Sequence, residues 1–212
     1  METFYAVPVG RNPGVYTTWV ETQRQVSGFP CAVFKKFYSY EEAQRYVDEK
    51  IVDNDCRSDV VATAGALQIF TDGSKTSLSS KLGYGVYVVG IGGLCGPVPP
   101  EVGATANAAE IYAIYRALCL VRDTPDLRHK TIEIYSDSNY AVQSITDRIK
   151  SWRLNEHNKG RPNYALIDET EKILTSLNVR IHWIRGHNDN PHNEMADKLA
   201  KRGRELEQEI VV

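Results

Sequence analysis

Apolar residues recur in two different rhythms in the larger, C-terminal part of the chain. Residues 67–71, 84–89 and 91–95 are short apolar runs separated by glycines, which predicts three strands joined by turns. Residues 110–121 place apolar side chains three or four positions apart, which predicts an amphipathic helix. This region therefore changes from strand to helix character.

Strand and helix patterns alternate through the rest of this region. Residues 131–136 and 178–184 are short runs rich in β-branched side chains, which predicts strands. Residues 138–149, 164–177 and 193–208 repeat apolar residues at helical spacing, which predicts helices. Three strands followed by alternating helices and strands predict an α/β fold, a mixed sheet with helices packed against it.

The first 47 residues show a different pattern. Aromatic and apolar residues alternate between Gly10, Gly14 and Gly28, which predicts short strands and turns. Ser39 is expected to cap a helix that ends this region, because Glu42 three residues later completes a capping box. The region therefore has the elements of a small α/β domain.

A polar segment rich in aspartate separates the two regions. Residues 48–66 contain five acidic and two basic side chains and end in small residues, which is typical of a linker. We therefore predict a small domain at 1–47, a linker at 48–66, a large domain at 67–205 and a C-terminal tail at 206–212.

Composition excludes several classes of protein. The chain has 212 residues, of which 42% are hydrophobic and 25% charged, as in ordinary globular proteins. It has no apolar run of about 18 residues, so we expect no membrane partner. The four cysteines form no CxxC pair, and the start of the chain lacks a secretory signal. We therefore expect free thiols and an intracellular protein of the nucleus or cytoplasm.

The net charge of −2 argues at first against a nucleic-acid-binding protein. The charge is unevenly distributed, however: +1 over residues 1–47, −3 over residues 48–66, and zero over the remainder. Residues 148–161 hold five basic side chains and one acidic side chain. A local basic surface is therefore compatible with an acidic total.

Two aspartates directly follow apolar strands in the predicted sheet. Asp72 comes after residues 67–71, and Asp137 comes after residues 131–136. Acids at the carboxyl ends of strands in an α/β sheet face the crevice where ligands bind. Two more acids lie near helix starts: Glu110 in the first turn of its helix and Asp197 early in the last helix.

Each acid also has a purely structural explanation. Asp72 could lie in a turn, and Glu110 could complete a capping box with Asn107. Asp137 could cap a helix, and Asp197 could favour the positive end of another. However, four acids on adjacent elements repel one another unless cations neutralise them, and carboxylates suit Mg²⁺ or Mn²⁺. Two such ions, about 3.5–4 Å apart, could hold the attacking water and the leaving oxygen of a phosphodiester.

The motifs around these acids resemble those of a type 1 ribonuclease H. The similarity covers residues 67–205 and rests on TDGS at 71–74, the helix with Glu110, YSDSNY at 135–140 and WIRGHNDNPHNEMADKLA at 183–200. That family has a five-stranded mixed sheet flanked by helices, and it cuts the RNA strand of RNA–DNA hybrids, leaving 3′-hydroxyl and 5′-phosphate ends. The resemblance implies that two Mg²⁺ ions, for which Mn²⁺ can substitute, are held by the catalytic acids Asp72, Glu110, Asp137 and Asp197.

The resemblance also makes His187, ten residues before Asp197, the mobile catalytic histidine of the family. A side chain that titrates near neutral pH can carry a proton to the leaving group or help the product depart. The alternative is an ordinary histidine of a surface loop. His182 and His192 do not match the motif, and we expect them to be sheet and loop residues.

Contacts to the nucleic acid are implied in the same way. A hybrid is distinguished by its 2′-hydroxyls and groove shape. The resemblance assigns nucleic-acid contacts to Gly73, Ser74, Thr105, Asn107, Asn139 and Asn163, of which Thr105 and Asn163 form part of a pocket for a DNA phosphate. Gly103 replaces an arginine that some members place in this pocket, and Ala106 replaces a frequent asparagine. We expect the weakened phosphate pocket to reduce binding by the large domain alone. The basic segment 148–161 is shortened but keeps a local net charge of +4, and the alternative is an ordinary solvated helix end and loop.

The small domain contains FYAV at 4–7, a G-R…G-V-Y…W stretch and FPCAVFKKF at 29–37. In these motifs it is similar to the hybrid-binding domain at the N-terminus of eukaryotic ribonucleases H, which is also found in a caulimovirus inclusion-body protein. The similarity implies that Trp19 and Phe34 contact the DNA strand, that Tyr5, Lys35 and Lys36 contact the backbone with help from Arg11, and that Phe29 and Phe37 lie in the core. Aromatic residues interleaved with lysines suit stacking combined with phosphate contacts.

We therefore expect a monomeric endoribonuclease specific for RNA–DNA hybrids, with a small domain that could also bind double-stranded RNA. An alternative is a non-catalytic protein that binds hybrids or double-stranded RNA, but the complete acid set argues against it. A DDE-type transposase or integrase would share the fold and the metal chemistry. It would not explain the small domain or the loop of His187.

Overall fold

The computed structural model of the chain describes residues 3–27, 32–48, 63, 65–77, 80–186 and 190–212. Contacts between residues divide the chain into two compact units, Met1–Val60 and Val61–Val212. Each unit has its own sheet and its own hydrophobic core.

The N-terminal unit is built on a three-stranded antiparallel sheet with the order β2-β1-β3. Its strands are β1 (Phe4–Val9), β2 (Gly14–Tyr16) and β3 (Val33–Phe37). Residues 40–48 are helical, and Ser39 caps them as predicted, because its Oγ accepts a hydrogen bond from the Glu42 backbone N–H at 3.4 Å. Ala6, Ala43 and Val47 form the small buried core between this helix and the sheet.

A helix that the sequence pattern does not predict lies between β2 and β3. This helix, α1 (Trp19–Val26), begins after Thr18, whose Oγ1 accepts a hydrogen bond from the Glu21 backbone N–H at 3.2 Å. The same hydroxyl donates to the Glu21 carboxylate at 2.8 Å. The prediction of strands and turns was wrong here because Trp19 and Val20 favour strands, whereas the pairing of Thr18 with Glu21 starts a helix.

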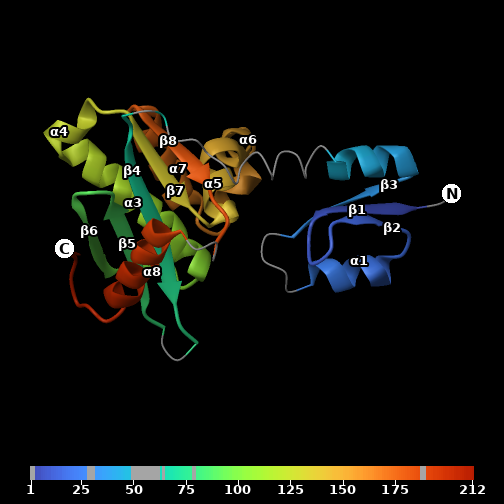
Figure 1. Cartoon of the computed structure of the whole chain (residues 1–212), viewed down its shortest axis with the longest axis horizontal. Helices are drawn as coiled ribbons and strands as arrows, with labels where there is room; N and C mark the ends of the chain where they lie inside the picture. Colours follow the sequence, from blue (N-terminus) through green and yellow to red (C-terminus); the bar gives the residue numbers. More distant parts are fainter. Residues whose placement is uncertain (1–2, 28–31, 49–62, 64, 78–79, 187–189) are drawn as a thin grey trace. The chain divides into compact units, whose positions relative to one another are not determined.

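The C-terminal unit contains a mixed sheet of six strands in the order β8-β7-β4-β5-β6-β9 (Figure 1). The strands are β4 (Leu67–Lys75), β5 (Leu82–Val88), β6 (Gly92–Pro97), β7 (Ile132–Ser136), β8 (Val179–Trp183) and β9 (Ile210–Val211). Neighbours among β4, β5 and β6 pair antiparallel, whereas β7 runs parallel to both β4 and β8. The predicted mixed sheet flanked by helices is confirmed.

The sheet has one strand more than the five predicted, and the extra strand comes from the segment 206–212, predicted to be a tail. Ile210 pairs with Cys95 at the edge of the sheet. Glu209 anchors this strand, since it accepts hydrogen bonds from the Arg116 guanidinium at 2.6 to 2.9 Å and from the Tyr84 hydroxyl. A strand of two residues shows no alternation in the sequence, and its position depends on these long-range contacts.

Helices cover the sheet in pieces that differ in length from the predicted ones. The elements are η1 (Pro100–Val102), α3 (Ala106–Asp123), α4 (Pro125–Arg128), α5 (Asn139–Gln143), the π-helical turn η2 (Ser144–Arg148), α6 (Ile149–Arg153), η3 (Glu156–Gly160), α7 (Tyr164–Thr175) and α8 (Pro191–Gly203). The helix predicted at 138–149 is thus interrupted by a π turn. The last helix stops at Gly203 instead of residue 208, because the chain turns there against β6, where a Cβ on Gly203 would lie 2.5 Å from the Gly96 carbonyl oxygen. In the described part of the chain, no helix is long and apolar enough to cross a lipid bilayer.

The helices α3 and α8 lie on opposite faces of the sheet, as Figure 1 shows. Ile111 of α3 belongs to the main core together with Ile69 of β4 and Ile134 of β7. Phe70, the next residue along β4, points to the other face and contacts the His192 ring of α8, with 5.3 Å between ring centroids. β4 is therefore the central strand between two helices, and side chains near its end can meet residues of both.

A buried acid on β7 ties the segment before β4 to the sheet. Glu133 is 1% exposed and accepts hydrogen bonds from the Thr63 hydroxyl at 2.6 Å and from the Tyr135 hydroxyl at 2.7 Å. Burial alone would raise the pKa of Glu133, but the hydrogen bonds from Thr63 and Tyr135 hold it below its ordinary value. The carboxylate therefore stays charged, and Thr63 is part of the C-terminal unit.

Candidate active site

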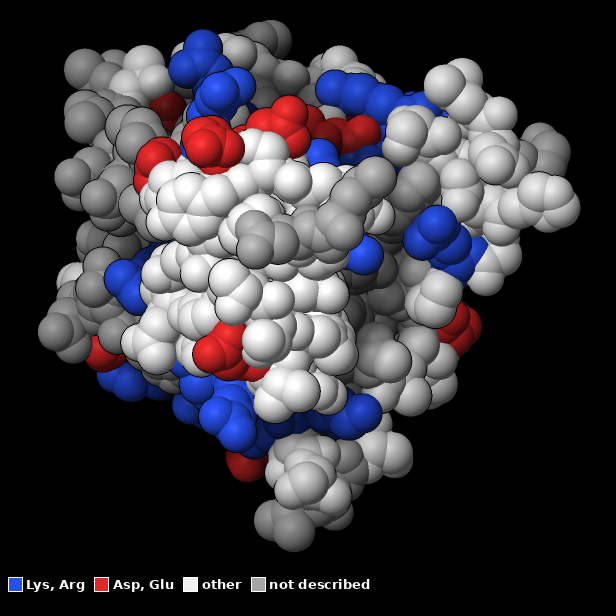
Figure 2. Space-filling view, turned by 90° about the vertical axis from the view of Figure 1, so that its right-hand side faces the viewer, with Lys and Arg blue, Asp and Glu red and all other residues white. Residues whose placement is uncertain are grey.

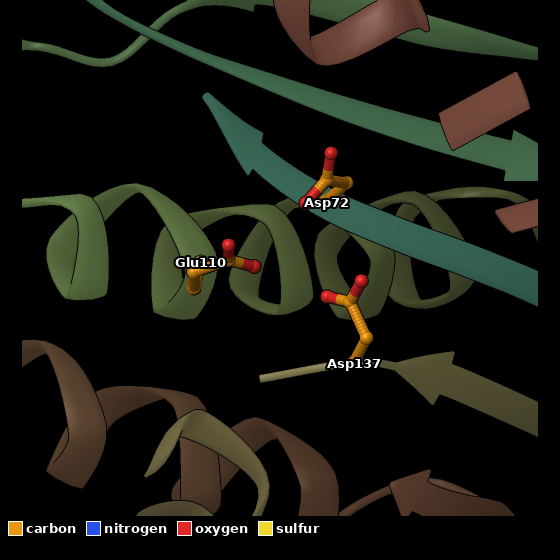
Figure 3. A group of neighbouring side chains, drawn as sticks. All are labelled: Asp72, Glu110 and Asp137. Atoms are coloured by element: carbon orange, nitrogen blue, oxygen red, sulfur yellow. The ribbon is translucent and has the colours of Figure 1, made fainter. Parts of the chain in front are cut away.

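Three carboxylates meet at the junction of β4, α3 and the end of β7. The parallel pairing of β4 with β7 places Thr71 beside Ser136, so the next residues, Asp72 and Asp137, lie at the same level of the sheet. Glu110 reaches them from α3, and Asp72, Glu110 and Asp137 each offer an oxygen within 4.8 Å of the others (Figure 3). Three of the four predicted metal-binding acids are thus brought together.

The structural explanations for single acids do not hold in this geometry. Asp72 lies inside β4, which continues to Lys75, and so it is not in a turn. The cap of α3 is Thr105, whose Oγ1 accepts from the Ala108 backbone N–H at 3.1 Å, so Glu110 forms no capping box with Asn107. The helix after Asp137 is capped by Ser138. These acids are therefore left without the local roles that would explain them.

Gly73 allows the close approach of α3 to β4. Its backbone N–H donates to Asp72 Oδ1 at 2.9 Å and to Glu110 Oε2 at 3.1 Å. A Cβ at this position would lie 2.3 Å from the Glu110 backbone nitrogen, which is far inside van der Waals contact. Only glycine lets the two elements come near enough for the carboxylates to share one donor.

Asp137 is held from two sides. Its carbonyl oxygen accepts a hydrogen bond from Trp183 Nε1 at 3.0 Å, and its Oδ2 accepts one from Asn193 Nδ2 at 3.2 Å. Gly186 also lies against this carboxylate, because a Cβ on Gly186 would be 2.9 Å from Asp137 Oδ2. The elements β8 and α8 therefore fix the third acid of the cluster.

The fourth predicted acid, Asp197, lies in the second turn of α8 and lines the same pocket. Its Oδ2 accepts a hydrogen bond from Lys201 Nζ at 2.6 Å. It is outside the group of three oxygens within 4.8 Å, but its charge and a hydrogen bond act on Asp72. Asp197 is thus a neighbour of Asp72 at the rim, paired with a lysine.

The clustering raises the proton affinity of the buried acids. Burial, the charges of Asp137 and Asp197, and a hydrogen bond to Asp197 raise the pKa of Asp72 from 3.8 to about 8. Burial and the charges of Asp72 and Asp137 raise the pKa of Glu110 well above its ordinary value. Carboxylates that repel one another in this way are stabilised by a divalent cation, and their oxygens are the ligands that Mg²⁺ and Mn²⁺ prefer. The donor set therefore fits a metal site.

The pocket above the carboxylates has a volume of about 480 Å³ and is open to solvent. Gly73, Ser74 and Ala106 line it together with the four acids, and so do three residues of α8 that the sequence interpretation did not single out: Asn193, Glu194 and Lys201. Asn193 and Lys201 lie four residues before and after Asp197, which places them on the same side of the helix. The sequence therefore contained a signal for Asn193 and Lys201, namely their spacing of four residues from Asp197.

The remaining predicted contact residues of the large domain lie at helix starts. Thr105 caps α3, Asn107 is exposed in its first turn, and Asn139 is the first residue of α5. Asn163 caps α7 with a left-handed backbone, φ 63°. Its Oδ1 lies 3.8 Å from the position that a Cβ on Gly103 would take, so the structure does bring Asn163 next to Gly103.

Two features limit the positive charge near these residues. Gly103 has φ 134°, a conformation that disfavours arginine or any other side chain at this position. In the basic segment 148–161, Arg153 forms ion pairs of 2.6 Å with both Asp168 and Glu171, so these two acids neutralise its charge. The basic segment therefore presents less free charge than its composition suggests.

Histidines occupy three different settings. His187 lies outside the described residues, and the turn at Gly186 leads into that segment. His182 is in β8, as expected, and its ring stacks on Tyr135 with 5.3 Å between centroids. His192 was expected in a loop but lies in the first turn of α8, where it stacks on Tyr87, because the cap at Asn190 starts the helix two residues before it.

The N-terminal unit has an aromatic cluster on one face of its sheet. The Trp19 ring lies 5.7 Å from Tyr5 and 5.2 Å from Phe34 between centroids, and Trp19 and Phe34 remain 43% and 46% exposed. Lys36 pairs with Tyr5 across the strands, and so it shares this face. Lys35 points to the other face, where its Nζ lies 5.2 Å from the Phe37 ring. The structure thus separates two lysines that were predicted to act together.

Among the other residues predicted for this unit, Arg11 donates to the carbonyl oxygens of Arg24 and Ser27 at 2.9 and 2.7 Å. Phe37 packs against the core as expected, while Phe29 lies outside the described residues. Figure 2 shows that basic and acidic side chains are interspersed around uncharged surface on the face that it displays. On that face, uncharged surface therefore lies between side chains of both charges.

Two family profiles match the chain. The profile described as RNase H matches residues 64–205, and the profile described as Ribonuclease H1 N-terminal domain matches residues 3–47. The two matches correspond to the C-terminal and N-terminal units, and the first covers the pocket with its acids.

Individual relatives extend over both units. A Ribonuclease H of Schizosaccharomyces pombe is 27% identical, with 94% of this chain and 96% of that protein aligned. Ribonuclease H1 of Rattus norvegicus is 26% identical, with 94% and 88% aligned. The solved structure of LC9-RNase H1, described as a type 1 RNase H with the type 2 active-site motif, has the same fold: its TM-score is 0.54 and its identity 21%, over 66% of this chain and 72% of that one. The chain belongs to the ribonuclease H family.

Proposed function

We propose that this protein is an endoribonuclease that hydrolyses the RNA strand of RNA–DNA hybrids with the help of divalent cations. The observation that carries the proposal is the cluster of Asp72, Glu110 and Asp137, whose oxygens lie within 4.8 Å of one another in an open pocket. The family to which the chain belongs and the names of its relatives support the choice of substrate.

The four acids would hold two Mg²⁺ ions, for which Mn²⁺ could substitute. Bound there, the ions would supply charge stabilisation to the attacking water and to the leaving oxygen, so that cleavage leaves a 3′-hydroxyl and a 5′-phosphate. Asp72, Glu110 and Asp137 form the inner cluster, and Asp197 would join them when its ion pair with Lys201 opens. The exposure of Asp197, whose side chain is 39% accessible, leaves it free to make that exchange.

Other residues of the chain would orient the hybrid and move protons. Gly73 and Ser74 line the pocket, where the backbone and the hydroxyl would approach the RNA strand. Thr105, Asn107, Asn139 and Asn163 lie at helix starts and would contact the two strands, with Thr105 and Asn163 near a DNA phosphate. His187 would carry a proton to the leaving group or help the product depart.

The N-terminal unit would hold the hybrid through its aromatic face. Trp19 and Phe34 are exposed rings in contact with each other, which suits stacking on the DNA strand, and Lys36 on the same face can meet a phosphate. Tyr5 supports Trp19, and Lys35 would reach the backbone from the edge strand β3. The same surface could take double-stranded RNA.

A cleavage assay on matched duplexes tests this proposal. The full chain is incubated with RNA–DNA, RNA–RNA and DNA–DNA duplexes of one sequence, with Mg²⁺ or with EDTA. We expect cutting of the RNA strand of the hybrid alone, and only with Mg²⁺. Tight binding of the hybrid without any cutting would instead favour a non-catalytic binding protein.

A further inference from the structure

Asn193 is a buried polar residue at the edge of the carboxylate cluster. It lies in the first turn of α8, lines the pocket and is 8% exposed. Its Nδ2 donates to Asp137 Oδ2 at 3.2 Å, while its Oδ1 is buried and has no hydrogen-bond partner among the described residues. We propose that Asn193 is a positioning residue that fixes Asp137 for cation binding, an inference that rests on the proposed metal-dependent function.

The orientation of the amide follows from its partner. The amide nitrogen of Asn193 is the donor and Asp137 Oδ2 is the acceptor, so the amide oxygen points away from Asp137. The start of the helix holds Asn193 in place, because Asn190 Oδ1 accepts hydrogen bonds from the backbone N–H groups of His192 at 3.0 Å and Asn193 at 3.2 Å. The donor is therefore presented to Asp137 by a capped helix start.

This contact complements the role of Gly73. The Gly73 backbone N–H holds one oxygen of Asp72 and one of Glu110, whereas Asp137 receives the side-chain donor of Asn193. A donor that fixes the rotation of a carboxylate beforehand reduces the conformational entropy that the carboxylate loses when it binds a cation. Such outer partners of metal ligands typically change metal affinity or activity by about 10–100-fold.

Stability alone does not account for an asparagine at this position. An apolar side chain of similar size would leave no unpaired buried oxygen, whereas Asn193 keeps one at the wall of a pocket. The unpaired oxygen can accept a hydrogen bond from a water molecule in the pocket. The asparagine is therefore better explained by what binds in the pocket than by the fold.

The test is a titration of the full chain with Mn²⁺, followed by the electron paramagnetic resonance signal of the free ion. Asn193→Leu keeps the volume and removes both polar groups. We expect its Mn²⁺ dissociation constant to rise about tenfold or more. Its melting temperature in EDTA should change little, because the lost hydrogen bond to Asp137 is offset by removal of the unpaired buried oxygen. In cleavage assays, the Mg²⁺ concentration for half-maximal rate should rise, and excess Mg²⁺ should restore much of the rate. Asn178→Leu, at an exposed asparagine bonded to Thr131, is the matched control and should bind Mn²⁺ like the wild type.

Wild-type Mn²⁺ affinity in Asn193→Leu, within twofold, would overturn the inference. If that variant does not fold, Asn193→Gln, which keeps the amide donor, is compared with Asn193→Ala, and equal Mn²⁺ affinity of the two would overturn it as well. Asp137→Asn is titrated alongside. If Asp137→Asn loses Mn²⁺ and Asn193→Leu does not, only this inference fails; if Asp137→Asn binds Mn²⁺ normally, the proposed metal site fails with it.

Discussion

Replacing Asp72 by asparagine should stabilise the metal-free protein at pH 8 while it destroys the metal site. In the folded chain, burial and the neighbouring acids raise the pKa of Asp72 from 3.8 to about 8. Between these two pH values, the unfolded chain has released this proton while the folded chain retains it. The free energy of unfolding therefore falls as the pH rises from about 4 to about 8, and Asp72 lowers it no further above pH 8.

The size of the effect follows from the shift. Each unit of pKa corresponds to about 1.4 kcal/mol. The shift of Asp72 from 3.8 to about 8 therefore lowers the free energy of unfolding by at most about 6 kcal/mol. The charge of Asp72 also raises the pKa of Glu110, so the two shifts are linked and removal of one acid recovers only part of this free energy, about 1–3 kcal/mol. For a unit of this size, each kcal/mol moves the melting temperature by about 2–4 °C.

Thermal melts followed by circular dichroism measure this effect. In EDTA at pH 8, Asp72→Asn should melt at least about 2 °C above the wild type, and the difference should shrink at pH 5. Mg²⁺ should raise the melting temperature of the wild type but not that of the variant. Glu207→Gln, which neutralises an exposed acid, is the control. It should melt like the wild type in EDTA, and Mg²⁺ should raise its melting temperature as it does for the wild type. An Asp72→Asn variant that melts below the wild type in EDTA at pH 8 would refute the account of repelling carboxylates.

Three further substitutions test other parts of the structure. Trp19→Ala should weaken binding of a hybrid by about 5- to 150-fold, the equivalent of 1–3 kcal/mol of stacking, with residual cleavage, as measured by fluorescence anisotropy. Gly73→Ala should lower both the stability and the Mn²⁺ affinity, because its Cβ would lie 2.3 Å from the Glu110 nitrogen and must push α3 away; overpacking of this kind costs about 1–3 kcal/mol. Glu133→Ala should cost about 1–3 kcal/mol in urea unfolding, because it leaves the buried hydroxyl of Tyr135 and the donors of Thr63 without their acceptor.

Each of these has a result that would contradict it. Hybrid binding by Trp19→Ala at wild-type strength would mean that the aromatic face of the N-terminal unit does not contact the hybrid. Unchanged Mn²⁺ affinity in Gly73→Ala would show that the carboxylates do not depend on the close approach of α3. Wild-type stability of Glu133→Ala would show that the hydrogen bonds between Thr63 and Glu133 do not stabilise the fold.

The sequence is informative about the large domain because its elements obey strong local rules. Asp72 and Asp137 each directly follow a short run of mostly apolar strand residues, and the helix of Glu110 has a clear apolar stripe. Parallel pairing of β4 and β7 aligns the ends of these runs. The sequence therefore predicts that the two aspartates meet, provided that the two strands are neighbours in the sheet. The acids are therefore found without knowledge of the loops.

Other features depend on contacts that no local pattern contains. The strand β9 forms because Glu209 meets Arg116 and Tyr84 from distant parts of the chain. The helix α1 was missed because its first residues are bulky and favour strands, although Thr18 and Glu21 form a capping pair. The Asn193 contact to Asp137 joins residues 56 positions apart, so only the folded chain shows which carboxylate it holds.

The central claim, that carboxylates holding cations cut the RNA strand of a hybrid, is tested most directly by Asp137→Asn. Cleavage of a labelled RNA–DNA hybrid in Mg²⁺ and binding of the same hybrid in EDTA are measured for the wild type and for this variant. We predict that the variant binds the hybrid nearly as well as the wild type and does not cut it. Cleavage by Asp137→Asn at the wild-type rate would contradict the assignment of the active site.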